Sequence, residues 1–118
     1  MNPINSNIKD DSVSRPNESI SEEEKKITAM SQYIKLNMLG FQNFRLKEFK
    51  FAKQNYNECV DVAKSLNDDI KHAETLTNLA ITLYFLGKFA ECLDKLESAA
   101  RITDRKYNEK SPPKNISQ

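Results

Sequence analysis

The chain has 118 residues, of which 38% are hydrophobic and 30% are charged, and its formal net charge is +1. This length favours a single domain. The near-neutral charge argues against a nucleic-acid-binding protein, whose surface would be strongly basic. No apolar run approaches the roughly 20 residues that span a bilayer, so we expect no membrane insertion. Residues 1–20 contain no apolar signal core, so we expect a cytoplasmic protein.

The composition also argues against the common cofactor and metal sites. Two cysteines and one histidine cannot form a Cys₄ or Cys₂His₂ zinc site. Two glycines in the whole chain leave no glycine-rich loop that could hold a phosphate group. We therefore expect neither a cofactor nor catalytic activity.

The folded domain is predicted to span residues 21–105. Residues 1–20 are rich in Asn, Ser and Asp and contain too few apolar side chains to offset the loss of chain entropy on folding. Residues 106–118 have a similar composition, and Pro112-Pro113 within them stops a helix. Both segments are predicted to be disordered tails.

Two helices are predicted in the first half of the domain. Ser21 and Glu24 have the spacing of a capping box, and the glutamates that follow Ser21 complement the helix dipole. Apolar residues then recur every three or four positions, which predicts a helix that reaches about Leu46. A second run with this spacing predicts another helix over residues 49–66.

Two more helices are predicted in the second half. Asn67-Asp68-Asp69 marks a turn and supplies an acidic residue to the next helix N-terminus. The third apolar run reaches Leu86, and Gly87 then ends the helix, because glycine adopts the left-handed conformation at little cost. The fourth run begins at Phe89 and ends near Arg105. No segment alternates with period two for long enough to form a strand, so we predict an all-α chain of about four helices.

The first and third helices share a pattern, and so do the second and fourth, with an offset of 40 residues. The aligned pairs include Leu39 with Leu79, Gly40 with Ala80, Phe49 with Phe89, Ala52 with Cys92 and Tyr56 with Leu96. A fixed period with two helices per unit is typical of a helical solenoid. Small residues such as Gly40 let antiparallel helices approach closely, while large residues fill the facing spaces.

This pattern resembles the tetratricopeptide repeat family. The resemblance implies an α-solenoid of antiparallel helix-turn-helix units, with unit one over residues 34–67 and unit two over residues 70–105. The 40-residue period is most similar to the longer repeats of G-protein-signalling modulators and rapsyn-like scaffolds. The chain departs from the motif at three positions. Lys47 replaces the turn glycine of unit one, Asn43 replaces its tyrosine-type residue, and Asp104 replaces the terminal proline of unit two.

The resemblance also implies a non-catalytic adaptor or scaffold that holds a peptide or helix of a protein partner in a concave groove. In this family the first helix of each unit lines that groove. The groove positions assigned by alignment are Ile34, Asn37, Met38, Phe41, Phe44, Arg45, Glu74, Thr77, Asn78, Ile81, Tyr84 and Phe85. Asn78 is the best candidate for hydrogen bonding to a peptide backbone, because a side-chain amide both donates and accepts. The alternative is that these residues pack against the start of the first helix or against further repeats.

The end of unit two supports a structural alternative. Two units are fewer than a solenoid usually needs, and no polar capping helix follows Ile102. We therefore expect Leu93, Leu96 and Ala100 to form an open apolar edge. Through this edge the chain would self-associate as a homo-oligomer or dock on a larger helical assembly. Two further alternatives are a regulatory subunit of an enzyme and a piece of a longer repeat protein.

The remaining reactive residues are interpreted as structural. Cys59 and Cys92 occupy small-residue packing positions, where cysteine acts as a small hydrophobe. His72 is interpreted as a surface residue near a helix N-terminus, because no nucleophile motif surrounds it. The acidic clusters at 22–24 and 68–69 lack the spacing of a calcium loop and complement helix dipoles instead.

Overall fold

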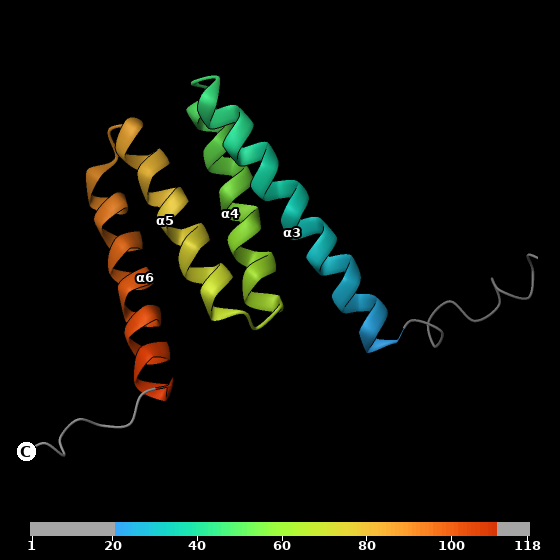
Figure 1. Ribbon diagram of the computed structural model, residues 1–118. Coiled ribbons are helices and arrows are strands. Elements are labelled where there is room, and N and C mark those ends of the chain that lie inside the picture. Colours follow the sequence, from blue (N-terminus) through green and yellow to red (C-terminus); the bar gives the residue numbers. More distant parts are fainter. Residues whose placement is uncertain (1–20, 111–118) are drawn as a thin grey trace, which may run out of the picture.

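The computed structural model describes residues 21–110, which form four α-helices (Figure 1). In chain order these are α3 (Glu22–Arg45), α4 (Phe49–Ser65), α5 (Asp69–Phe85) and α6 (Phe89–Lys110). Residues 21–110 contain no strand, and the all-α prediction is confirmed. The tail predicted for residues 1–20 and the part of the other tail beyond Lys110 lie outside the described residues.

The N-termini of α3 and α5 are fixed by side chains that accept backbone hydrogen bonds. At α3, the Glu24 backbone N–H donates to Ser21 Oγ over 3.1 Å, and the Ser21 backbone N–H donates to Glu24 Oε1. At α5, the Lys71 backbone N–H donates to Asp68 Oδ1 over 3.0 Å. This bond is the main cause that lowers the pKa of Asp68 below its ordinary value. Both acidic clusters therefore cap helices, as predicted.

Three-residue turns of one conformation join the helices. In each turn the middle residue has a positive φ, namely 63° at Lys47, 56° at Asn67 and 78° at Gly87. In the first turn the Lys47 N–H donates to Phe44 O and the Glu48 N–H donates to Asn43 O, which is the Schellman pattern. Lys47 thus adopts a left-handed conformation that favours glycine, at the position where the repeat motif has one.

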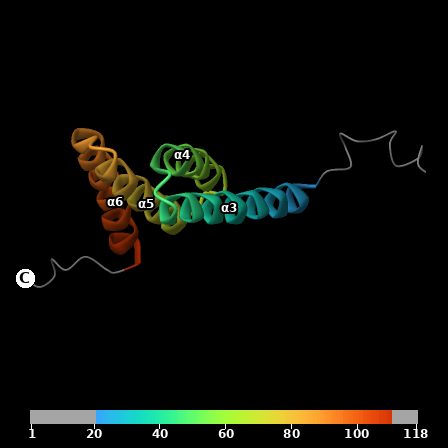
Figure 2. The same ribbon diagram turned by 90° about the horizontal axis from the view of Figure 1, so that it is seen from above.

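The helices alternate in direction, and each packs mainly on its neighbours in sequence. Seen from above, α4 lies on one side of α3 (Figure 2). Two groups of buried side chains hold the helices together. The larger group consists of Ala52, Tyr56, Val60, Leu76, Leu79, Leu83, Ala99 and Ile102. The smaller consists of Tyr33, Leu36, Cys59 and Ala63. Burial of these apolar surfaces is the main favourable contribution to folding.

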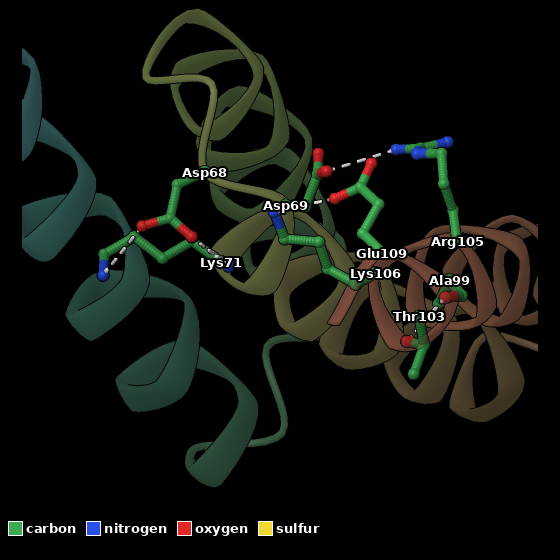
Figure 3. Close-up of polar contacts among 8 residues, drawn as sticks. All are labelled: Asp68, Asp69, Lys71, Ala99, Thr103, Arg105, Lys106 and Glu109. Carbon is green, nitrogen blue, oxygen red and sulfur yellow. Dashed lines mark hydrogen bonds and ion pairs between the residues drawn. The ribbon is translucent and has the colours of Figure 1, made fainter. Parts of the chain in front are cut away.

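Helix α6 continues beyond the predicted end of the domain. The prediction placed a tail from residue 106 onward, but residues 106–110 form the last turns of α6. Arg105 NH2 lies 3.4 Å from Asp69 Oδ2, and Lys106 Nζ lies 3.4 Å from Glu109 Oε1 (Figure 3). The first pair joins the C-terminal half of α6 to the start of α5. The second supports the final turn locally, where the sequence has no helix stop before Pro112.

Candidate partner-binding face

The predicted groove residues stand on the two helices that begin the repeat units, α3 and α5. On α3, Ile34, Met38 and Phe41 are exposed and follow each other at steps of four and three residues. On α5, Ile81, Tyr84 and Phe85 are exposed close to the C-terminus. We call these six residues the A-helix face. It places large apolar side chains in contact with solvent on two neighbouring helices.

Two contacts tie α3 to α5 and so hold the A-helix face together. Near the middle of α3, the Tyr33 hydroxyl lies 3.3 Å from Thr75 Oγ1 on α5. At the C-terminal ends of both helices, the rings of Phe44 and Phe85 meet edge to face with centroids 5.4 Å apart. The two helices are therefore connected at two levels along their length.

Five aromatic rings are linked in a cluster at the end of the molecule where the α3–α4 and α5–α6 turns lie. Phe44, Phe49 and Phe85 contact one another with centroids 5.2–5.4 Å apart. Tyr84 contacts both Phe85 and Phe89 at 5.5 Å. Such ring pairs contribute beyond their buried area, by about 0.5–1.5 kcal/mol each. The cluster thus fixes the positions of Tyr84 and Phe85 at one border of the A-helix face.

The polar residues predicted for the groove differ in their surroundings. The Arg45 guanidinium lies 5.8 Å from the centroid of the exposed Phe41 ring, within reach of a cation–π interaction. Thr77 Oγ1 donates a hydrogen bond to Ala73 O of its own helix over 3.0 Å, so its hydroxyl hydrogen is already used. Asn37 and Asn78 are half-buried on α3 and α5. Arg45 and Phe41 are therefore brought together, whereas Thr77 is engaged in its own helix.

Phe49 and Phe89 were not among the predicted site residues. In the sequence they stand out only as the aligned first residues of the second and fourth helices. The structure leaves Phe89 exposed and joins both rings to groove residues. One sequence signal could have identified them. Each of these phenylalanines follows a three-residue turn, and an aromatic groove residue stands just before that turn, Phe44 in the first case and Phe85 in the second.

Hollows on the molecular surface lie elsewhere. One of about 450 Å³ is lined by Lys50, Lys53, Gln54, Asn57, Glu58, Leu86 and Lys88. A wider one of about 710 Å³ lies between the start of α3 and the α4–α5 turn. Neither is lined by a residue of the A-helix face. The A-helix face is therefore separate from these two hollows.

A buried polar chain connects α3, α4 and α5 beneath this surface. Thr75 Oγ1 donates to Lys71 O and meets the Tyr33 hydroxyl, while Cys59 Sγ donates to Tyr33 O over 3.6 Å. Burial is the main cause that raises the pKa of the Cys59 thiol and of the Tyr33 hydroxyl. Both cysteines are free, as the packing interpretation requires. A buried thiol with a raised pKa is a poor nucleophile, so this group of hydrogen-bonded side chains has a structural role.

The other reactive groups do not form a site. His72 is half-buried on the first turn of α5, and burial is the first cause that lowers its pKa. It is therefore less exposed than the predicted surface histidine. Within residues 21–110, no three His, Cys, Asp or Glu side chains are grouped so that they could hold a metal ion.

The open edge predicted on the last helix is present on α6. Leu93, Leu96 and Ala100 are all exposed. Tyr56 and Leu96 occupy equivalent positions, 40 residues apart, on the second helix of each unit. The side chain of Tyr56 is 4% exposed, whereas that of Leu96 is 41% exposed. The difference arises because α5 covers α4, while no described helix covers the same face of α6.

A family profile described as Tetratricopeptide repeat matches residues 31–105, which is more than half of the chain. The chain belongs to the tetratricopeptide repeat family. Searches among curated proteins and among solved structures gave no match. The tetratricopeptide repeat is a non-catalytic fold that in general mediates protein–protein interactions. No helix within residues 21–110 is both long and apolar enough to cross a membrane.

Proposed function

We propose that this tetratricopeptide repeat protein is a non-catalytic adaptor that binds an amphipathic helix or apolar peptide of a partner protein across the A-helix face. The observation that carries the proposal is the exposure of Ile34, Met38 and Phe41 on α3 beside Ile81, Tyr84 and Phe85 on α5. Exposed apolar patches of this kind mark interaction surfaces.

The chemistry of the face indicates the kind of partner. Its side chains are aliphatic and aromatic, and the cationic Arg45 stands at its edge beside Phe41. An amphipathic helix presents apolar residues at i, i+3, i+4 and i+7, a spacing that matches the stripe on α3. Asn78 supplies the hydrogen bond to the partner's backbone, and Arg45 pairs with a carboxylate at the edge of the interface.

The free cysteines and the near-neutral charge support the rest of the proposal. Cys59 and Cys92 are unpaired, which fits the reducing cytoplasm. The net charge of +1 fits a protein partner better than nucleic acid.

Selection of peptides displayed on phage, each about 15–20 residues long to give a helix of four to five turns, tests the proposal. The expected ligands carry apolar residues at helical spacing. Their affinity should fall by roughly tenfold or more for Phe41→Ala and for Asn78→Ala. Phe51→Ala is the matched control, because Phe51 is 58% exposed and Phe41 is 55% exposed, but Phe51 lies on α4. Ligands that lose affinity equally for all three variants, or for Phe51→Ala alone, would exclude the A-helix face.

A second function is favoured by the exposure of Leu93, Leu96 and Ala100 on α6. In this alternative the chain is a structural subunit that associates through its last helix. The two functions use different faces, so a variant at Leu96 and a variant at Phe41 separate them.

A further inference from the structure

The exposed face of α6 carries a longer apolar stripe than the open edge alone. Its residues follow one another at steps of four, three, four, three and four: Phe89, Leu93, Leu96, Ala100, Thr103 and Tyr107. All six are exposed. We call this stripe the α6 seam. Its spacing is that of the a and d positions in a coiled coil, which bury their side chains against another helix.

The α6 seam extends beyond what another repeat would cover. The internal helix α4, which α5 covers, has Lys53 at the position equivalent to Leu93, and the position equivalent to Tyr107 is Asn67, in the turn after α4. At these two positions the last helix therefore carries a larger apolar side chain than the equivalent segment of unit one. It is also longer, with 22 residues against 17 in α4. These differences indicate a partner helix of about five turns that follows the whole seam.

The opposite end of the molecule does not fit this seam. On α5, the residues that face α4 include the fully buried Thr75 and Thr82. The equivalent residues on α3 are Lys35 and Gln42, and both are exposed. Thr75 contacts Cys59 on α4, so docking α3 of one copy on α6 of another in the same way would bring the Lys35 ammonium next to Ala99, the equivalent of Cys59, where its desolvation is unfavourable without a partner charge. Head-to-tail association is therefore disfavoured.

The seam fits a second copy of itself in the antiparallel direction. With the two-fold axis at residue 98, Leu96 faces Ala100 of the partner copy, Leu93 faces Thr103, and Phe89 faces Tyr107. Each leucine then meets a smaller side chain, as close packing of helices requires. A parallel pair would place Leu96 against Leu96 and Ala100 against Ala100, which leaves crowding at one level and a void at the next.

The charges along α6 favour the same direction. Residues 89–98 hold three carboxylates, Glu91, Asp94 and Glu97, against the single cation Lys95, for a net charge of −2. Residues 99–109 hold three cations, Arg101, Arg105 and Lys106, against Asp104 and Glu109, for a net charge of +1. Antiparallel α6 helices bring the acidic half of each next to the half that carries Arg101, Arg105 and Lys106, and their dipoles oppose. Of these cations, Arg105 and Lys106 also pair with Asp69 and Glu109 of their own copy.

From this size and charge complementarity, we propose that the protein forms an isologous dimer through antiparallel pairing of its two α6 seams. The seam and the A-helix face share no residue, and they meet only where Phe89 of the seam contacts Tyr84 of the face. A two-fold interface uses each contact twice and closes, so it produces a dimer and no filament.

Sedimentation equilibrium of the full chain over a wide concentration range tests the dimer without any peptide present. The expected species is a dimer whose dissociation constant rises roughly 100-fold or more for Leu96→Glu and for Ala100→Glu, because each buries unpaired charge twice. Circular dichroism checks that both variants stay helical. Phe51→Glu, at an exposed phenylalanine on α4, should leave the dimer intact. A wild-type monomer, or a dimer that both seam variants leave unchanged, would overturn the proposal.

Disulfide trapping tests the direction of the pair. In the antiparallel register, a mixture of Leu96→Cys and Ala100→Cys chains should form a mixed disulfide much faster than either variant alone. Disulfide formation requires Cα atoms within about 7 Å, so only facing positions react readily. The wild type, with its own Cys59 and Cys92, is the control. Faster formation of the two homodisulfides would show a parallel pair and overturn the proposed geometry.

Discussion

The ring of Tyr56 on α4 occupies the space that a side chain on Gly40 would need. A Cβ on Gly40 would stand 2.6 Å from Cε1 of Tyr56, closer than two carbon atoms can approach. Tyr56 is buried in the larger core group, so its ring has little room to move. The glycine in the C-terminal part of α3 therefore serves helix packing, as the repeat pattern predicted.

Gly40→Ala should destabilise the protein, although alanine is the better helix former by about 1 kcal/mol. Overpacking against Tyr56 typically costs about 1–3 kcal/mol, which outweighs that gain. Unit two pairs Ala80 with Leu96 at the equivalent positions. The double variant Gly40→Ala/Tyr56→Leu should therefore recover part of the loss. Urea unfolding of Gly40→Ala, Tyr56→Leu and the double variant gives a double-mutant cycle. If the changes in the free energy of unfolding of the two single variants simply add up in the double variant, the direct contact is contradicted.

Lys47→Gly should stabilise the protein by up to about 1 kcal/mol. Lys47 has a φ of 63°, and an L-residue with a side chain pays roughly 1–2 kcal/mol for this left-handed conformation. Part of the gain is offset because glycine makes the unfolded chain more flexible. Asn67→Gly should have a smaller effect, since asparagine tolerates this conformation better. Thermal unfolding measures both, and a lower midpoint for Lys47→Gly would contradict the expectation.

Asp68→Ala should cost about 1 kcal/mol at neutral pH, because it removes the N-cap of α5. The folded state lowers the pKa of Asp68 below its ordinary value of 3.8. Its contribution is therefore present above that pH and is lost as the pH falls through the folded pKa. The difference in unfolding free energy between wild type and Asp68→Ala should shrink in acid. Asp68→Asn keeps a capping oxygen without a titratable group, so its stability relative to Asp68→Ala should depend little on pH.

Cys59 should react with iodoacetamide only when the protein opens. Its thiol is buried, and burial raises its pKa, so little thiolate is present or accessible in the native state. Cys92 is only half-buried and should react faster. Mass spectrometry of alkylated peptides over time, with and without denaturant, measures the two rates. Equal native rates at both residues would contradict the packing of Cys59 against α3.

Most of the fold could be predicted because the helix ends carry local signals. The Ser21 capping box, the Asp68 cap and Gly87 act within one turn of the chain, so the sequence alone places these boundaries within a residue or two. The end of α6 was placed five residues too early. There the composition of residues 106–118 suggested a tail, but no helix stop precedes Pro112 and the pair Lys106–Glu109 supports one more turn.

The candidate face was predicted less completely than the fold. Exposure of Phe41, Ile81 and Phe85 agrees with the groove positions that the family resemblance assigns to the first helix of each unit. The ring contacts of Phe49 and Phe89 depend on how two turns meet in space, which the period does not describe. The hydrogen bond between Tyr33 and Thr75 likewise spans 42 residues and becomes apparent only once the helices are packed.

The three-residue turns described above also determine how the chain reaches its structure. Because each helix packs mainly on the next helix in sequence, most native contacts join residues close along the chain, and the contact order is low. All-helical proteins of low contact order fold within microseconds to milliseconds. Each helical hairpin can form first and add its neighbour, as in other repeat proteins. The outer helices α3 and α6, each packed mainly on one neighbour, are then expected to exchange their amide hydrogens before α4 and α5 when the monomer opens.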